Sequence, residues 1–445
     1  MTGLDADTGT TQETTQPRLK RDISGAMLYL FILGDVLGAG IYALVGQIAG
    51  KVGGATWAPM VVALLLALLT AASYAELVTK YPKAGGSAVF AERAYRSPVV
   101  SFLVGYCMLA AGVVSASGLA LAFAGDYLST FVDVPSVLGA IVFLALVGLI
   151  NARGIKESVR ANLVMTMIET TGLVLVVVAA CVMLGRGDGD LGRATQFPAG
   201  TSPVVATFSA ALLAYYSFVG FETSANVVEE VKDPTRNYPR ALFGALGTAG
   251  LLYVLVGTAA SAAVPADELS STTGPLLAVI DATGVAIPSW LFSLIALVAV
   301  ANGALLTMIM ASRLAYGMGA QGLLPAVFAK VLPGRGTPWV AIVVTTGVAM
   351  ALTATGSIAT LAETVVLLLL VVFLSTNVAV LVLRRDRVDH DHFRAWTVLP
   401  VLAAVSCVVL MSRQTAQVWL RGGIIVAVGV VLYGVTVVAR RNRKD

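Results

Sequence analysis

The stretch Gly34-Asp35-Val36-Leu37-Gly38-Ala39-Gly40-Ile41-Tyr42 lies in the middle of the first apolar run of the chain, about residues 23–49. A run of that length can cross a bilayer, which takes roughly 20 residues. Its centre nevertheless holds glycines and a carboxylic acid, and glycine weakens a helix by about 1 kcal/mol relative to alanine. A helix that opens at membrane depth exposes N–H and C=O groups that lipid cannot satisfy. We therefore expect this stretch to line a polar cavity, as half of a binding site for a small charged solute.

The composition is that of an all-α integral membrane protein. The chain has 445 residues, of which 58% are hydrophobic and 12% are charged, and its mean hydropathy is +0.87. Soluble domains are less apolar than this. Long apolar runs recur along the whole chain and predict twelve membrane-spanning helices, at about residues 23–49, 57–79, 99–125, 134–152, 160–184, 204–228, 240–263, 287–314, 338–355, 358–383, 396–411 and 419–439.

The basic residues between these spans predict their orientation in the membrane, and the turn residues predict the loops that connect them. Of the 29 basic residues, 24 lie in the segments on the N-terminal side of the membrane, which predicts that both termini are cytoplasmic. The longest connections on the other side, 185–203 and 265–288, are rich in turn residues and predict loops. We expect a disordered tail at 1–22, a first repeat of five spans at 23–184, a second at 204–383, two further spans at 396–439 and a tail at 440–445.

The sixth span repeats the irregularity of the first. Its middle reads Tyr215-Tyr216-Ser217-Phe218-Val219-Gly220-Phe221-Glu222, which places a glycine, a serine and a glutamate at membrane depth. If spans one to five and six to ten are two repeats, the interruptions fall at corresponding positions, and such pairs mark the central site of transporters. A glycine pair alone could instead serve close helix packing. The matching interruption favours a binding site.

The ends of opened helices predict what the site binds. A half-helix that starts near Ile41 offers free N–H groups and a positive dipole end, which suit a carboxylate. Gly38 and Gly40 allow that backbone to come close to the solute. Open carbonyls near Val36 and at 217–219 would accept hydrogen bonds from an ammonium group. A site for both groups is a site for a free α-amino acid.

Several polar and aromatic side chains in the spans are candidate site residues, and most have a structural alternative; for Glu169 the alternatives are a hydrogen bond from the protonated acid and a salt bridge to a basic residue. Asp35, Glu169 and Asn302 lie at membrane depth, where a charged residue costs about 2.5–3.5 kcal/mol and usually marks an ion or proton path. Tyr216 and Phe218 could contact the solute or simply pack in the core. Glu222, the acid of the second interruption, could either function in transport or pair with a loop arginine.

Six stretches resemble the amino acid–polyamine–organocation superfamily, in particular bacterial permeases related to the cationic amino acid transporters. They occur in the family's order over most of residues 23–383, so the resemblance is specific to the family and leaves the substrate open. The stretches are GAGIY at 38–42, YAELVTKYPKAGGSAVF at 74–90, NARGIKES at 151–158, SFVGFE at 217–222, EEVKDPTRNYPRA at 229–241 and SRLAYGMGAQGLLP at 312–325.

The resemblance implies the leucine-transporter fold, which has two inverted repeats of five helices, with helices one and six broken, and two further peripheral helices. It also implies alternating access. By position in the motifs, Gly38, Ala39 and Gly40 fall on the loop that binds the substrate carboxylate. Tyr216 falls where the family carries an aromatic gate, and Thr307 falls on a substrate-facing position of the eighth span.

The same resemblance raises the question of a coupling ion. Many sodium-independent relatives carry a lysine in the fifth span where this chain has Glu169, and Asp35 replaces a small or apolar residue. Glu222 falls where several members carry an acid linked to proton coupling. The resemblance directs Glu169 at the first interruption, where an all-oxygen cage would suit sodium and a dehydrated carboxyl group would bind a proton instead. The atoms of that expected site are the side chains of Glu169 and Asn302 and the carbonyls of Gly34, Leu37 and Ala299.

These patterns predict a secondary amino acid transporter in the cell membrane, driven by a proton or, alternatively, by sodium. A polyamine or cationic amino acid transporter is the alternative substrate class, and a transporter-like amino acid sensor is the alternative of a different class. An enzyme is not expected, because no histidine lies within a predicted span, and no phosphate-binding lysine motif indicates ATP. The expected partners are the amino acid and the bilayer, without nucleic acid, for a monomer or weak homodimer that needs no cofactor beyond its coupling ion.

Overall fold

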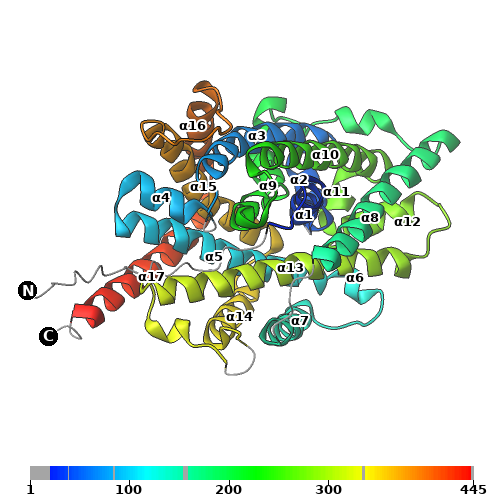
Figure 1. Cartoon of the computed structure of the whole chain (residues 1–445). Coiled ribbons are helices and arrows are strands. Elements are labelled where there is room, and N and C mark those ends of the chain that lie inside the picture. The colour runs from blue at the N-terminus through cyan, green and yellow to red at the C-terminus, as the bar shows by residue number, and fades with distance from the viewer. Residues whose placement is uncertain (1–20, 39, 84–85, 154–158, 333–335, 442–445) are drawn as a thin grey trace, which may run out of the picture.

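The computed structural model describes residues 21–38, 40–83, 86–153, 159–332 and 336–441. Ala39, most of the expected N-terminal tail and the end of the C-terminal tail lie outside these residues. The described part of the chain is helical and contains no strand, only an isolated parallel bridge between Ile23 and Val231. The predicted all-α class is therefore confirmed (Figure 1).

Within the described residues, eight helical segments are long and apolar enough to cross a membrane, and a bent pair of helices would make a ninth. The bent pair is α1 (Gly25–Leu37) with α2 (Gly40–Val52). The eight are α3 (Trp57–Lys80), α5 (Pro98–Phe123) with α6 (Asp126–Ser129), α8 (Val159–Arg186), α9 (Pro203–Tyr216) with the 3₁₀ turn η2 (Phe221–Asn226), α10 (Pro234–Ala263), α13 (Ser289–Ala320), α15 (Ile358–Leu383) and α17 (Ala416–Arg441).

Three shorter apolar helices lie where the fourth, ninth and eleventh spans are expected. They are α7 (Ser136–Ala152), α14 (Trp339–Thr353) and α16 (Val398–Ser412). The remaining short elements are α4 (Gly86–Tyr95), α11 (Ala266–Ser271), α12 (Pro275–Ala282), η1 (Leu191–Thr195), η3 (Val228–Glu230) and η4 (Ala326–Ala329). The prediction of a loop at 265–288 was wrong in part, because α11 and α12 form there and pack on α2.

Helix α5 lies at the centre of the bundle and α17 lies at its edge. The most apolar window of α5 is 78% buried inside the protein, whereas that of α17 is 17% buried. α5 packs against α13 on one side and α15 on another, and small residues allow close contact: a side chain on Gly112 would meet Ala311 and Thr307 of α13. Figure 1 shows α17 and α16 at the periphery, with α1, α2 and α9 enclosed by the other helices. The interrupted spans are therefore surrounded by protein.

Candidate functional site

The first interruption separates α1 from α2. α1 begins after Ser24, whose hydroxyl accepts a hydrogen bond from the Met27 N–H at 3.3 Å, and it ends at Leu37. α2 begins at Gly40 and runs at 42° to α1. The interruption thus occurs at the glycines that predicted it, and the N-terminal N–H groups of α2 begin there.

The second interruption takes a different form. α9 ends at Tyr216, and Ser217 to Val219 form turns. Gly220 then has φ of +128°, a conformation that only glycine adopts readily. The chain continues through the 3₁₀ turns η2 and η3 and does not resume an α-helix before α10.

A glycine of each interruption contacts the backbone of the other. A Cβ atom on Gly40 would lie 2.8 Å from the Cα atom of Ser217. A Cβ atom on Gly220 would lie 2.7 Å from the carbonyl oxygen of Asp35. Both distances are too short for real carbon contacts, so each position requires glycine, and the two interruptions form one compact unit.

Tyr253 of α10 joins the same two segments. Its hydroxyl donates to the carbonyl oxygen of Val36 at 2.5 Å and to that of Ser217 at 2.9 Å. Its ring is fully buried and packs edge-on against Phe218, with 5.1 Å between the ring centroids. Sequence analysis missed Tyr253; the one available signal was a tyrosine in an apolar span, whose hydroxyl must find a partner when buried.

A cavity of about 500 Å³ lies against the two interruptions, a size that suits a small ligand. Helices α4, α5, α13 and α15 also contribute to its wall. Its lining also includes Glu230 and Arg313, and Glu230 lies near the start of α1 because its carbonyl accepts a hydrogen bond from the Ile23 N–H at 3.0 Å. The cavity wall includes these predicted site residues: Asp35, Val36, Gly38, Gly40, Tyr216, Ser217, Val219, Glu222 and Thr307.

The polar groups of the wall belong mainly to the interruptions. The Thr223 hydroxyl donates to the carboxylate of Asp35, and the Gly220 N–H donates to the carboxylate of Glu222 at 2.9 Å. Within the described residues, Glu222 therefore pairs with backbone and not with a loop arginine. The Tyr216 hydroxyl is 2.8 Å from the Ser115 hydroxyl of α5. The buried hydroxyl of Ser217 has no hydrogen-bond partner among the described residues.

Two described residues that were predicted to contact the solute lie outside the cavity wall. Ile41 and Phe218 are fully buried, and Phe218 packs on Tyr253, so the packing interpretation of Phe218 fits the structure. Ile41 lies in the first turn of α2. Ala39 lies outside the described residues.

A second group of predicted residues meets beside the first interruption. The side-chain amide of Asn302 in α13 donates to Oε1 of Glu169 in α8 at 3.0 Å. Glu169 is fully buried, and its Oε2 atom has no hydrogen-bond partner among the described residues. A Cβ on Gly34 would collide with the Thr166 hydroxyl of α8.

The remaining members of the expected ion site are also buried. Leu37 and Ala299 have no exposed surface. The Cα atom of Gly303, next to Asn302, is 4.0 Å from the Cβ position of Gly38. Helices α8 and α13 thus meet at the first interruption, beside a buried Glu169 oxygen that has no hydrogen-bond partner in the described part of the chain.

Comparisons with known proteins identify the family of the chain. A family model described as amino acid permease matches residues 23–438. The chain is 27% identical to a methylthioribose transporter of Bacillus subtilis (strain 168) over 445 residues, covering 93% of each chain. It is 26% identical to a branched-chain amino acid permease of the same organism, covering 93% of this chain and 92% of the other. It is 25% identical to a low-affinity putrescine importer of Escherichia coli (strain K12), covering 97% of each.

These relatives are transporters and not enzymes. Several helices of the chain can span a membrane, and the family model matches it from the start of α1 almost to the end of α17. The protein therefore belongs to the amino acid permease family.

Proposed function

We propose that this protein is a secondary active amino acid transporter of the cell membrane that works by alternating access. The main supporting observation is that two interrupted spans contact each other at the wall of one cavity. A glycine of each interruption packs against the backbone of the other. Twelve spans, with an inverted repeat of five and five, account for the long helices together with the three shorter apolar ones. Both termini are then cytoplasmic, and the part of the cavity lined by Glu230 and Arg313 faces the cytoplasm.

The solute lies between the two interruptions. Its carboxylate meets the N–H groups at the start of α2, near Gly38 and Gly40, where the helix dipole favours a negative charge. Its ammonium group lies toward the carbonyls of the second interruption and the free hydroxyl of Ser217. Such a site binds the carboxylate and the ammonium group of the solute mainly through main-chain groups, and it needs no oppositely charged side chain for either.

We further propose that a cation bound at Glu169 drives transport, with the proton favoured over sodium. The supporting observation is that Glu169 is fully buried with one carboxylate oxygen unpaired among the described residues. A buried carboxylate with one oxygen unpaired is costly, so we expect it to bind a proton or a cation. The carbonyls of Gly34, Leu37 and Ala299 and the side chain of Asn302 would supply further oxygen ligands for sodium.

Uptake into proteoliposomes tests the transporter and its coupling together. Wild-type uptake of an amino acid should depend on a pH or sodium gradient. Glu169→Gln and Glu169→Lys should lose that dependence, whereas Glu92→Gln, at an exposed acid on α4, should keep it. Unchanged gradient dependence in Glu169→Gln contradicts the coupling site. Binding of an amino acid without any uptake would indicate a sensor instead.

A second substrate class has an observation in its favour. The carboxylates of Asp35 and Glu222 both border the cavity, where they could neutralise a second ammonium group. One relative is a putrescine importer. Competition decides the question: displacement of label by arginine, lysine or putrescine supports a cationic substrate, and displacement by neutral amino acids alone contradicts it.

A further inference from the structure

Helix α16 is shorter than the membrane that it would have to cross. Its 15 residues give it a length of about 22 Å, at about 1.5 Å per residue. The hydrocarbon core of a bilayer is about 30 Å thick, so α16 falls short by about 8 Å. The next helix along the chain, α17, has 26 residues and is about 39 Å long, which is sufficient.

One face of α16 is apolar and exposed. The helix packs on α3 and α15, and the buried residues Pro400, Ala403, Cys407 and Leu410 share one side of it. Exposed valines and leucines recur every three or four residues along the opposite side. They are Val398, Val401, Leu402, Val405, Val408 and Val409. In a membrane-spanning helix, a face of this kind contacts lipid.

A tryptophan lies at each end of this apolar face. Trp396 comes just before α16, and its side chain is 81% exposed, more than any other large apolar side chain in the described residues. At the other end, the indole N–H of Trp419 in α17 donates to the Met411 carbonyl at 3.1 Å. Tryptophan favours the boundary between hydrocarbon and headgroups, because its ring is apolar and its N–H is polar. The two side chains thus mark boundaries only about 22 Å apart.

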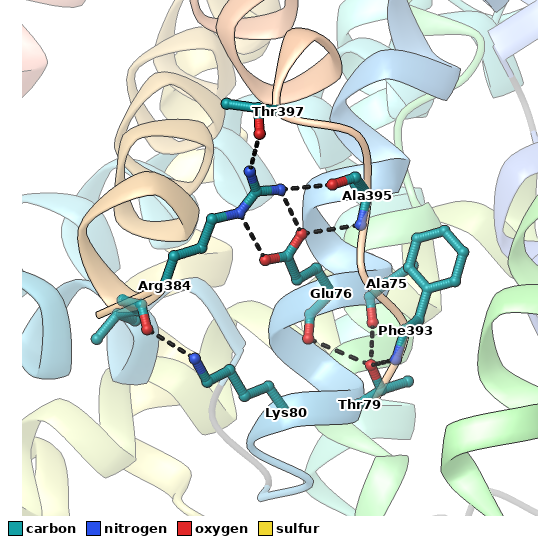
Figure 2. Close-up of polar contacts among 9 residues, drawn as sticks. Ala75, Glu76, Thr79, Lys80, Arg384, Phe393, Ala395 and Thr397 are labelled. Carbon is teal, nitrogen blue, oxygen red and sulfur yellow. Dashed lines mark hydrogen bonds and ion pairs between the residues drawn. The ribbon is translucent and has the colours of Figure 1, made fainter. Parts of the chain in front are cut away.

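The start of α16 is fixed to α3, so the helix cannot shift along the membrane normal to reduce the mismatch (Figure 2). The Arg384 guanidinium binds the Glu76 carboxylate through two nitrogens, at 2.9 and 2.8 Å, and both side chains are largely buried. This pair also holds both neighbours of Trp396. The Ala395 N–H donates to Glu76 at 2.9 Å, and Arg384 donates to the Ala395 carbonyl at 2.6 Å and to the Thr397 hydroxyl at 2.7 Å. Breaking this network would leave a buried carboxylate unpaired, which is strongly unfavourable.

The connection between α15 and α16 is held against α3 and α10 as well. The Thr79 hydroxyl in the last turn of α3 accepts a hydrogen bond from the Phe393 N–H at 3.0 Å (Figure 2). The Lys80 ammonium donates to the Leu383 carbonyl at 2.7 Å. The Phe393 ring packs on Phe243 of α10, with 5.8 Å between the ring centroids. The segment that carries Trp396 is therefore rigid although it is not helical.

The two ends of α16 differ in how they meet the membrane. At its end, Trp419 joins α16 to α17, so the two helices share one boundary there. Because α17 is long enough to cross the hydrocarbon core, the mismatch falls at the start of α16, around Trp396.

We propose that the bilayer is thinned by about 8 Å where it meets the start of α16, so that this face selects phospholipids with short acyl chains. Lipid adapts here because the helix is pinned at both ends and a bilayer deforms at a modest cost. The inference rests on the proposed crossing of the membrane by α16 and needs no assumption about the solute.

Fluorescence quenching measures the depth of Trp396. All five tryptophans are exposed, so four of them can be replaced by phenylalanine to leave Trp396 alone: Trp57, Trp290, Trp339 and Trp419. The protein is reconstituted in dioleoylphosphatidylcholine that carries a nitroxide either near the headgroup or in the middle of the acyl chain. Quenching by the shallow label should exceed that by the deep label at least about twofold, as for an interfacial side chain. The control, Val405→Trp together with Trp396→Phe, places the indole in the middle of α16 and should be quenched more by the deep label.

Stronger quenching of Trp396 by the deep label overturns the thinning. A variant that keeps only Trp419 must also be quenched more by the shallow label, since a deep Trp419 would mean that α16 lies off-centre in a bilayer of ordinary thickness. If neither label quenches Trp396, water or a second copy of the chain covers this face, and the proposal is wrong.

Lipid selectivity is measured in an equimolar mixture of dimyristoleoyl- and dierucoylphosphatidylcholine, with one or the other brominated as the quencher. Trp396 should favour the shorter lipid about threefold, because mismatch costs a fraction of a kcal/mol per Å. Val431→Trp, on the exposed face of α17 in a background without other tryptophans, should show no preference. Equal quenching of Trp396 by the two lipids overturns the selectivity.

These measurements are independent of the solute. Quenching as expected in a protein that takes up no amino acid contradicts the proposed function alone. Normal uptake by a protein with a deep Trp396 contradicts the thinning alone.

Discussion

The two interrupted spans differ in how the chain continues after the interruption. The first resumes as a regular α-helix of 13 residues, α2, whereas the second continues through the 3₁₀ turns η2 and η3. A regular helix start presents N–H groups and a positive dipole end, and 3₁₀ turns present no comparable dipole. The second segment instead brings the carboxylate of Glu222 and the free hydroxyl of Ser217 to the cavity. In the proposed site, this difference would supply a positive end for the carboxylate and a negative end for the ammonium group of an amino acid.

Gly40→Val is the change expected to have the largest effect, because it forces the two segments apart. Its side chain would collide with the backbone of Ser217 and fill the space that the solute carboxylate needs. Uptake should fall at least about 100-fold, to background, as expected when a buried contact must shift. Gly247→Val is the matched control, since nothing lies within 4 Å of a Cβ there. Wild-type uptake by a normally inserted Gly40→Val protein would refute the site.

The position of both interruptions was predictable from sequence because their signals are local. Glycines and charged residues within an apolar run mark an opened helix whatever surrounds it, and Gly38, Gly40 and Gly220 do so here. The proximity of Glu169 and Asn302 was anticipated through the family resemblance. The helices α11 and α12 were missed because they are short, lie among turn residues and pack on α2.

The contacts that join distant segments were not predictable in the same way. Tyr253 lies in an apolar span whose sequence does not indicate the two carbonyls that its hydroxyl meets. Lys51 and Glu363 are 312 residues apart, so only the folded arrangement pairs them. The sequence likewise places Phe218 on the second interruption but does not predict the contact between its ring and that of Tyr253.

Tyr216 lies at the end of α9, where the second interruption begins. Substitutions of Tyr216 should lower uptake less than Gly40→Val does. Tyr216→Ala removes a large ring from the cavity wall and should lower uptake about tenfold or more, as loss of a closing element does. Tyr216→Phe loses only the hydrogen bond to Ser115 and should lower uptake about twofold. Equal rates for wild type and both variants would exclude a gating role for the ring.

Tyr253→Phe removes the hydroxyl that joins the two interruptions but keeps the ring that packs on Phe218. The free energy of unfolding should fall by about 1–3 kcal/mol, and uptake by about fivefold, because two buried carbonyls lose a partner. Tyr29→Phe is the matched control: it also removes a hydroxyl contact between α1 and α10, to Thr248 at 2.8 Å, but away from the interruptions. A larger loss of uptake in Tyr29→Phe would argue against the role assigned to Tyr253.

The most direct test of the central claim is binding, measured as thermal stabilisation of the purified protein. All amino acids and polyamines are screened, and the best amino acid is then compared with its methyl ester and its N-acetyl derivative. We expect the free amino acid to stabilise the wild type, neither derivative to do so, and Gly40→Val to show no stabilisation by any of them. Stabilisation by putrescine or by the methyl ester equal to that by the amino acid would contradict a site in which the first interruption binds a carboxylate.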